Sequence, residues 1–539
     1  MFRHGLAAFL PLAILIAIPL LLRPDVKQRA QDVAAAERLV IITPHSESLR
    51  YEFGRAFRDY YRRQTGREIR IEWRTPGGTS DIVRFIADRF ESAFRQEWLS
   101  HPENGPWTAE IAAGFINPKA VPGSKFSPAA VRARQLFLHS DIGIGIDLFF
   151  GGGQFDQQRH ADRGYAVDAG MQRRHPEWFT EAVIPQTFSG ETFYDVGGRY
   201  YGVCLASFGI CRNPQRMAEL PFLSPPEEWQ DLGNPRWYAQ IAIADPTKTG
   251  SVNKCFEMMV QQQMANAFSA GGGAAALDRG WADGINLIKR LAANSRYVTD
   301  SAGKVPHDVA GGGAAAGICI DFYGRSEAEW TAVQNGGKPR MEFVTPVGGS
   351  SVSADPIQLL RGAPDRAAAV AFIEFTLSEE GQKLWAFRPG TPGGPKHYAL
   401  RRTPIRKDLN RPEYRPYLSD PEVDLYRTCA GFRYHPEWTG RYFNLLRILI
   451  RCIALDPLPE LQDAWRAIAR AGGPTAVPQA MAKFNELPFA YHDIEKVRQA
   501  LSTDQVGNSV LSVLRLRRAW TEQSRRQYRE AAQLARAGK

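Results

Sequence analysis

Strand and helix patterns alternate at the start of the body of this chain. Leu39–Thr43 is an apolar run typical of a buried strand, and apolar residues at helical spacing follow it as far as Gly66. Ile69–Trp73 alternates like a second strand, and a second helical pattern begins at Gly77–Asp81. This order predicts an α/β fold whose parallel sheet is covered by helices.

Length and composition agree with a globular protein of more than one domain. The chain has 539 residues, of which 44% are hydrophobic and 23% are charged, so a disordered chain is not expected. The net charge of +10 favours encounters with anions, but no nucleic-acid-binding signature accompanies it. We therefore expect no nucleic acid among its partners.

An uncharged apolar run, Gly5–Leu22, precedes the body. It is near the lower limit for a membrane span and longer than the core of a usual signal peptide. We expect residues 1–37 to form an uncleaved signal anchor, a transmembrane helix with its juxtamembrane linker, that tethers a periplasmic body to the inner membrane. A cleaved signal is the alternative, and because basic residues also follow the run, a cytoplasmic body stays open.

The six cysteines show no spacing typical of a zinc site. In an exported protein an even number permits disulfides, and Cys204 with Cys211 or Cys429 with Cys452 are the local pairs. Buried free thiols are the alternative.

Strand signals continue along the chain until the composition changes near Ser419. Ile142–Asp147, Gly317–Asp321 and Met341–Thr345 have the pattern of strands, and the small residues of Ala267–Leu277 predict a loop. From Ser419 to the end of the sequence, the pattern is helical and rich in arginine. We expect residues 419–539 to form a C-terminal α-helical extension, whose basic end is a solvated helix face or a contact for lipid or a partner.

Three predicted strand ends deliver hydroxyl residues or glycines to the start of a helix. They are Thr43–Ser46, Gly77–Asp81 and Thr247–Ser251. Free N–H groups and the positive end of the helix dipole favour an anion at such a place, and open α/β sheets bind ligands there. Together these ends would suit a phosphate, phosphonate, sulfate or carboxylate group, although each Ser or Thr alone is also an ordinary helix cap.

Motifs of catalysis are missing from the sequence. Thr247–Ser251 lacks the glycine pattern of a P-loop, and neither a Gly-x-Ser-x-Gly elbow nor a His-Glu-x-x-His motif occurs. We therefore predict that the protein is not an enzyme and has no catalytic residue. His45 is a candidate ligand or metal contact, and Asp321 with Tyr323 offers oxygen ligands for a hard cation such as Fe³⁺. Structural roles are the alternative for each.

Three motifs in order resemble one known family. Pro226-x-x-Trp229-x-Asp231-Leu232 followed by Asp245-Pro246-Thr247, the stretch from Tyr201 to Asn213, and Gly362–Asp365 with its following helix pair resemble periplasmic solute-binding proteins of bacterial ABC importers. The resemblance covers about residues 38–418 and is strongest for the ferric-iron-type group, which includes binders of phosphorylated sugars, phosphonates and thiamine.

Within that group, His45 matches a histidine that ferric binders place after their first strand. Tyr323 falls near their adjacent tyrosine pair, but this chain has one tyrosine there, between Phe322 and Gly324. An anionic organic solute therefore fits the resemblance at least as well as ferric iron.

The resemblance implies a two-lobed periplasmic-binding-protein fold, type II-like, that closes on its ligand by hinge motion. Its first lobe is expected in residues 38–140 and 348–418, and its second lobe in residues 141–347. The implied function is that of an extracytoplasmic solute-binding component of an ABC transporter, with permease subunits as partners and no cofactor apart from bound Fe³⁺. A membrane-tethered sensor for a signalling partner, or an enzyme on the same scaffold, are the alternatives.

The expected ligand contacts are the hydroxyl, glycine and acidic residues at these strand and helix ends. They are Thr43, His45, Ser46, Gly78, Thr79, Ser80, Asp147, Thr247, Thr249, Gly250, Ser251, Asp321 and Tyr323. His45 and Tyr323 would be metal ligands only if ferric iron is the solute.

Overall fold

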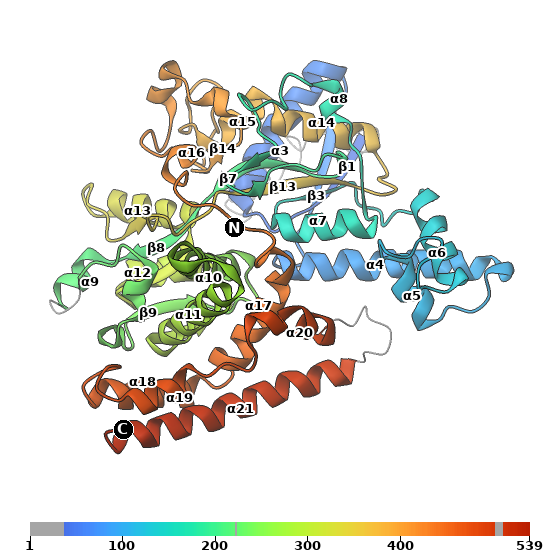
Figure 1. Cartoon of the computed structure of the whole chain (residues 1–539). Helices are drawn as coiled ribbons and strands as arrows, with labels where there is room; N and C mark the ends of the chain where they lie inside the picture. The colour runs from blue at the N-terminus through green and yellow to red at the C-terminus, as the bar shows by residue number, and fades with distance from the viewer. Residues whose placement is uncertain (1–36, 221–223, 502–509) are drawn as a thin grey trace, which may run out of the picture.

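The computed structural model describes residues 37–220, 224–501 and 510–539 (Figure 1). The anchor and linker predicted for residues 1–37 lie outside these ranges, apart from Glu37, which begins β1. Within them, no helix combines the length and the apolar character that a membrane span requires.

Two lobes, each built on its own sheet, make up the body of the protein. The sheet of lobe 1 has the strand order β14-β7-β13-β3-β1-β2, with β4 paired to β13. The expected parallel pairing of the first two strands is present, since β1 pairs with β2 from Glu37 opposite Ile69 to Ile42 opposite Arg74. The elements of lobe 1 are β1 (Glu37–Ile42), α3 (Glu47–Thr65), β2 (Ile69–Arg74), α4 (Thr79–Ser100), α5 (Ala109–Phe115), α6 (Pro128–His139), β3 (Leu148–Phe150), α7 (Gln154–Arg163), β4 (Ala166–Val167), α8 (Met171–Arg174), β5 (Thr187–Phe188), β6 (Glu191–Thr192), β7 (Tyr201–Ala206), β13 (Ser353–Leu360), α14 (Arg366–Leu377), α15 (Glu379–Ala386) and β14 (Thr403–Pro404).

Lobe 2 is built on a mixed sheet with the strand order β10-β9-β11-β8-β12. The central strands β9 and β11 are parallel, whereas β8 runs antiparallel to both of its neighbours. The elements of lobe 2 are β8 (Phe208–Arg212), α9 (Pro214–Ala218), β9 (Ile241–Ala244), α10 (Gly250–Gly271), α11 (Gly273–Ala293), β10 (Ser295–Thr299), α12 (Lys304–Ala310), β11 (Ala316–Ile320), α13 (Asp321–Gln334) and β12 (Glu342–Val344).

The predicted boundary between the lobes at residue 141 is wrong. Strand β3 pairs with β1, and β7 pairs with β13, so residues 141–206 belong to the sheet of lobe 1. The chain crosses at Ser207, between β7 and β8, and returns between β12 and β13, close to the predicted residue 347. Ile142–Asp147 is not the strand that its alternation predicts, because ladder pairing begins only at Leu148.

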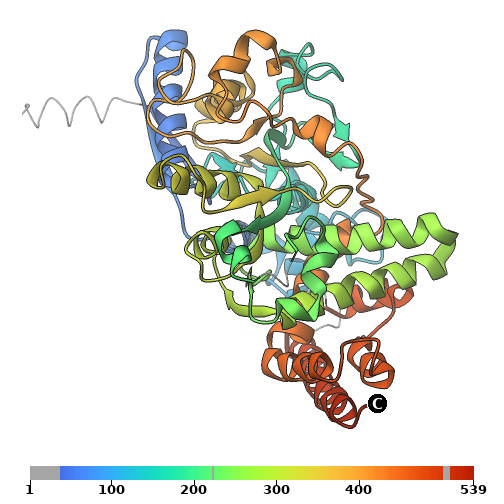
Figure 2. The ribbon, with the colours of Figure 1, turned by 90° about the vertical axis from the view of Figure 1, so that its left-hand side faces the viewer.

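Helices α10 and α11 form a long hairpin that projects from lobe 2 (Figure 2). The loop predicted at Ala267–Leu277 is wrong, since only Gly272, with φ of +63°, separates the two helices. A Cβ at Gly284 would lie 2.6 Å from the Cα of Val260, so a glycine is required at this point, where the two helices pack closely.

The residues after Ser419 are mostly helical. Leu425 and Cys429 belong to a core cluster of lobe 1, whereas the residues from Phe432 onwards pack against lobe 2. In Figure 1 the helices α18, α19 and α21 lie below the green helices of lobe 2. The helices of this extension are α16 (Leu425–Thr428), α17 (Phe443–Ile450), a π-helical turn (Arg451–Leu455), α18 (Leu458–Arg470), α19 (Pro478–Asn485), α20 (Ile494–Leu501) and α21 (Val510–Arg536). Short 3₁₀ turns elsewhere are Pro102–Asn104, Trp229–Gly233, Pro235–Trp237, Lys407–Leu409, Pro412–Tyr417, Gly440–Tyr442 and Tyr491–Asp493.

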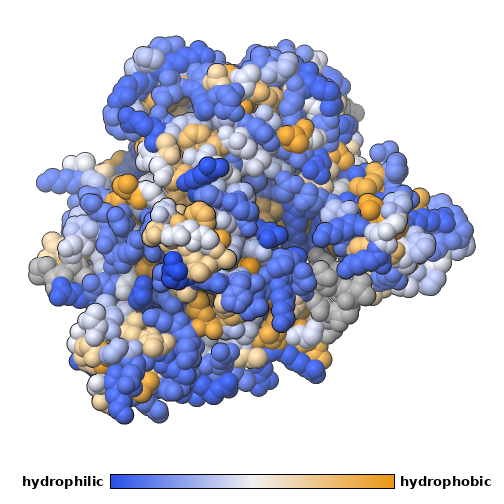
Figure 3. Space-filling view, in the orientation of Figure 1, coloured by the Kyte–Doolittle hydropathy of each residue, from blue (hydrophilic) through white to orange (hydrophobic). Residues whose placement is uncertain are grey.

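One continuous hydrophobic core joins lobe 2 to the extension. Trp465 and Tyr528 of the extension are fully buried in the same cluster as Ile243 of β9 and Ile285 of α11. Polar contacts support this packing, because Trp465 Nε1 donates to Asn294 Oδ1 at 2.8 Å. The face seen in Figure 3 is correspondingly mostly hydrophilic, with hydrophobic residues in small scattered patches.

The cysteines are buried free thiols, and the disulfides that their even number permits do not form. All six cysteines lie in the described ranges, and each is buried without a disulfide.

Candidate functional site

A cavity of about 1060 Å³ lies between the lobes. Its walls come from lobe 1 through His45, Thr79 and Gln154, and from lobe 2 through Thr249 and Tyr323. The extension supplies a further part of the wall, which contains Tyr434, Pro436, Gly440, Arg441 and Phe443.

Several helix N-termini meet at this cavity, among them those of α4, α7 and α10 and that of α3 with its cap residue Ser46. The cap residues of α4, α7 and α10, which are Gly78, Gly153 and Thr249, all line it. Among the described residues, no side chain of a cap residue accepts from the first turn of α7 or α10, and Thr249 Oγ1 is buried without a hydrogen-bond partner. The first-turn N–H groups and the Thr249 hydroxyl are therefore donors that an anion in the cavity can use.

The lobes approach each other closely at the α4 and α10 ends of the cavity. A Cβ placed on Gly78 would lie 3.5 Å from the carbonyl oxygen of Lys248, which is an ordinary van der Waals contact. On the floor of lobe 1, a Cβ on Gly151 would lie only 2.5 Å from His45 Cε1. Gly151 also has φ of +94°, so a glycine is required there for the loop to pass the imidazole.

His45 belongs to a buried charged cluster in lobe 1. Its Nε2 lies 3.1 Å from Asp355 Oδ2, its ring packs edge-on against Phe150, and its Nδ1 has no partner among the described residues. Arg402 forms an ion pair with the same Asp355. Burial lowers the pKa of His45, with the nearby Asp355 opposing this in part, so the imidazole is neutral near pH 7.

Asp355 is charged because its partners outweigh its burial. Burial raises its pKa, but the charge of Arg402 and the hydrogen bond to His45 hold the pKa below its ordinary value overall. The guanidinium of Arg402 lies 3.8 Å from the ring centre of Phe322, the residue before Tyr323. Tyr323 is 38% exposed and lines the cavity. The positive charge of Arg402 stands near its phenol.

A second buried cluster surrounds Lys254, one turn into α10. Lys254 Nζ lies 2.8 Å from Glu191 and 2.9 Å from Glu257, and 3.9 Å from the ring centre of Tyr434. Tyr434 and Thr439 of the extension donate to Glu257 Oε1 at 2.8 and 2.6 Å. Burial lowers the pKa of Lys254, but the two carboxylates outweigh it and raise that pKa overall.

The structure brings eight of the expected contacts to the cavity: His45, Ser46, Gly78, Thr79, Thr249, Gly250, Ser251 and Tyr323. The other five do not line it and have local structural partners. Thr43 Oγ1 accepts from the N–H of His45, and Thr247 Oγ1 donates to Asp245, which are both turn contacts. Asp147 accepts from the backbone of Val40 and Asp365.

Asp321 and Ser80 also face other protein groups. Asp321 Oδ2 lies 2.9 Å from Arg325 Nη1, and Ser80 Oγ accepts from Arg447 Nη1 of the extension at 3.1 Å. The sequence analysis missed the charged residues Arg402, Asp355 and Lys254, together with every cavity residue of the extension. Local patterns could not reveal them, because their positions follow from contacts between segments far apart in the chain.

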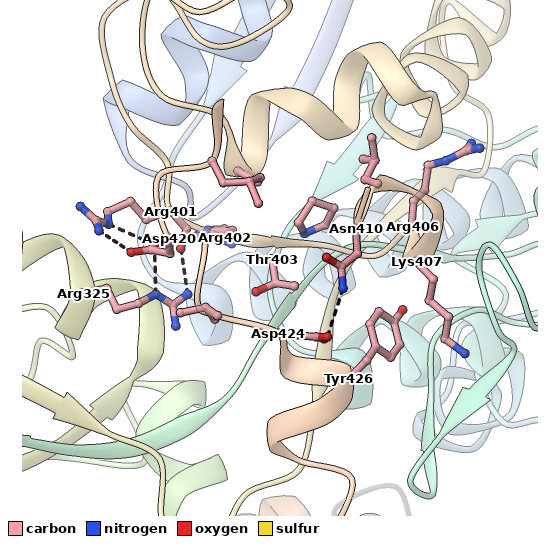
Figure 4. A pocket seen from close by; sticks show the side chains of 15 residues that line it. Arg325, Arg401, Arg402, Thr403, Arg406, Lys407, Asn410, Asp420, Asp424 and Tyr426 are labelled. Atoms are coloured by element: carbon pink, nitrogen blue, oxygen red, sulfur yellow. Dashed lines mark hydrogen bonds and ion pairs between the residues drawn. The ribbon is translucent and has the colours of Figure 1, made fainter. Parts of the chain in front are cut away.

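A second cavity, of about 270 Å³, lies between α13 and the segment 401–426 (Figure 4). Asp420 pairs with both Arg401 and Arg325, and Arg325 donates to the carbonyl of Arg401 at 2.9 Å. These charges engage one another across the lobe boundary. We therefore place the candidate ligand site in the larger cavity and regard this network as a connection beside the hinge.

A resident metal centre has no support in the described residues, which contain no group of three or more His, Cys, Asp or Glu side chains arranged to hold a metal ion.

Comparison with known families gives one match. The family described as bacterial extracellular solute-binding protein matches residues 141–415. An uncharacterized protein of Haemophilus influenzae is 25% identical over 238 residues, which are 44% of this chain and 60% of that protein. The phosphoglycerate transport regulatory protein PgtC of Salmonella typhimurium is 23% identical over 279 residues, 50% of this chain and 57% of PgtC. The chain thus spans 60% or less of these relatives' length.

Two solved structures illustrate the similarity in fold. The periplasmic binding protein AfuA from Actinobacillus pleuropneumoniae, with exogenous fructose-6-phosphate bound, has 17% identity and a TM-score of 0.47, covering 76% of this chain and 97% of AfuA. Iron-bound HitA from Pseudomonas aeruginosa has 14% identity and a TM-score of 0.44, covering 76% of this chain and 98% of HitA.

Proposed function

This chain belongs to the family of bacterial extracellular solute-binding proteins, and from that premise we propose that it captures a small anionic solute in the cleft between its lobes. The solute class is a phosphate, phosphonate or phosphorylated organic acid or sugar. Capture is reversible and non-catalytic: helix N-termini hold the anionic group, and lobe closure removes it from water.

The observation that carries this proposal is the meeting of α4, α7 and α10 at one cavity. Each helix has ten or more residues, and each presents its N-terminal end to the same space. The buried Thr249 hydroxyl without a partner among the described residues is a donor that a bound anion would satisfy. An unsatisfied buried hydroxyl is costly, so a ligand that accepts from it gains affinity.

Ferric iron is a weaker candidate as the solute. His45 Nε2 is engaged by Asp355, and the guanidinium of Arg402 stands near Tyr323. The charges of Arg402 and Asp355 act on this phenol in opposite directions, so the weaker case for iron rests on His45, whose Nε2 is already engaged.

The partners of this activity follow from the family. The protein would deliver its solute to an ABC permease on the periplasmic side, and residues 1–37 would tether it to the inner membrane as an uncleaved helix. To test this role, the full-length chain is isolated from detergent extracts. Co-isolation of a permease complex with the same solute specificity would support it.

The test is a thermal-shift panel with Fe³⁺, inorganic phosphate, a phosphonate, phosphoglycerate and fructose 6-phosphate. A solute at about 100 times its Kd should stabilise the protein by about 2.7 kcal/mol. Thr249→Ala should weaken binding of that solute about tenfold, the size expected for a lost hydrogen bond to a charged group.

Thr247→Ala is the matched control, because Thr247 lies in the same loop but its hydroxyl donates to Asp245 and does not line the cavity. It should leave the affinity unchanged. The proposal is wrong if only Fe³⁺ shifts the protein and His45→Ala abolishes that shift.

A further inference from the structure

The extension crosses from one lobe to the other at the cavity. Its helices α18 to α21 share the core of lobe 2. Its segment 434–447 also reaches lobe 1, at hairpin β5–β6 through Tyr434 and at α7 and α4 through two further contacts. The rings of Phe443 and Phe155 of α7 have centroids 5.3 Å apart, and Arg447 Nη1 donates to Ser80 Oγ of α4 at 3.1 Å.

Both contacts with α7 and α4 are made by groups that are costly to leave without partners. Phe443 and Arg447 are 7% and 8% exposed. Burial lowers the pKa of Arg447, which the charge of Asp156 on α7 partly offsets, while Arg84 lowers it further. If the lobes parted, Phe443 would lose an aromatic partner and face water, whereas the core that joins the extension to lobe 2 would stay intact.

The same segment also forms part of the cavity wall. Tyr434 is fixed by its bond to Glu257 and by its N–H, which donates to the carbonyl of Ser189 at 2.7 Å beside hairpin β5–β6. A Cβ on Gly190 would lie 1.8 Å from the Tyr434 carbonyl, so only glycine admits the extension so close to this hairpin. Tyr434 is thus held where lobe 1, lobe 2 and the extension meet.

We propose that segment 434–447 is a third wall of the ligand site, and that docking of Phe443 and Arg447 onto α7 and α4 is part of lobe closure over the solute. The wall moves as one body with lobe 2. The part of this inference that concerns the solute rests on the proposed function, whereas the docking of the extension on lobe 1 does not.

The test measures a distance between lobe 1 and the extension in ligand-free protein. Spin labels are placed at Asp88→Cys on α4 and Arg518→Cys on α21, two exposed positions, and the six native thiols are buried. Phe155→Ala should lower the ratio of docked to undocked molecules about three- to tenfold, the size expected for a lost aromatic pair. Ser80→Ala should shift the ratio in the same direction by less.

Phe268→Ala is the matched control. Phe268 is another partly exposed phenylalanine in contact with the extension, 5.7 Å from the ring of Trp438, but it lies on α10 of lobe 2. Removing it should leave the distance distribution as in the wild type. The inference is overturned if neither Phe155→Ala nor Ser80→Ala changes the distribution, or if Phe268→Ala changes it as much.

A second arm adds inorganic phosphate or fructose 6-phosphate to the labelled wild type. A shift towards the docked distance supports the link between the third wall and the solute, and binding without such a shift overturns that link. If neither solute binds while Phe155→Ala still undocks the extension, the proposed solute class is wrong and the docking itself stands.

Discussion

Lobe 1 and lobe 2 bury the apolar side chains that cover their sheets in different ways. In lobe 1 the apolar side chains form two large clusters. One contains Phe53 and Trp385 and takes in the buried residues Leu425 and Cys429 at the start of the extension, and the other contains Phe90 and Phe94. In lobe 2 the cluster continues without a break into the extension, through Trp465 and Tyr528. The second lobe therefore depends on residues outside the family match, which ends at residue 415.

The largest expected effect follows from removing α18 to α21. A chain that ends at Leu455 would expose the face of lobe 2 that Trp465, Ile468, Phe484 and Tyr528 cover, each of them fully buried. Burial of each such side chain stabilises by about 1.5–3 kcal/mol, so their joint loss is comparable with the total stability of a typical domain, about 5–15 kcal/mol. Lobe 2 should lose its native fold while the β1–β2 region of lobe 1 stays protected, which hydrogen exchange can measure strand by strand.

The comparison between the lobes would be wrong if amides of β9 and α11 kept their protection in the shortened chain. It would equally be wrong if β1 and β2 lost protection together with them.

A single substitution tests the same shared core with a smaller effect. Trp465→Ala should destabilise lobe 2 by about 3–5 kcal/mol, because it leaves a large cavity and removes the donor to Asn294 Oδ1. Trp330→Ala is the control, since Trp330 is on α13 of lobe 2 but is 58% exposed. Urea unfolding should show a clear shift for the first variant and almost none for the second.

The smallest effect concerns pH and distinguishes the lobes by their histidines. Because burial lowers the pKa of His45 in the folded state, its contribution to stability is complete above about pH 6.5 and is lost as the pH falls. In lobe 2 His307 is mostly exposed, as is His492 in the extension. Acid should therefore weaken lobe 1 before lobe 2.

His45→Asn should remove about 1 kcal/mol of the stability that lobe 1 loses between pH 7.5 and pH 5.5. Burial lowers the pKa of His160 to about 3. Its effect on the slope of stability against pH is the same in the wild type and in His45→Asn, so it cancels when the two are compared. Equal slopes in the wild type and the variant would show that His45 is not a buried neutral group.

Local signals in the sequence predicted much of the fold and part of the candidate site. The strand and helix order at Leu39–Phe90 and the helix that Ser378 caps depend on neighbouring residues, and both occur as expected. The hydroxyl and glycine residues that follow β1 and β9 reach the cavity because their placement also depends on neighbouring residues. Thr43 and Thr247 do not, because a side-chain hydroxyl three or four positions before the first helical residue satisfies its own turn.

Signals that depend on distant partners were misread. Ile142–Asp147 alternates like a strand, yet pairing with β1 begins after it, and this also displaced the boundary of the lobes. Ala267–Leu277 has the composition of a loop, yet only Gly272 interrupts the two helices there, and the close packing that requires glycine lies further along the hairpin, at Gly280 and Gly284.

The sequence alone determined that this is an α/β chain with hydroxyl and glycine residues at several helix N-termini, because hydrophobic periodicity and cap residues act over a few positions. Only the tertiary structure decided that Arg402, Asp355 and Lys254 become charged parts of the cavity, and that the extension completes lobe 2 and enters the cleft. Burial, ion pairing and shared cores arise between residues hundreds of positions apart, and no local pattern in the chain records those contacts.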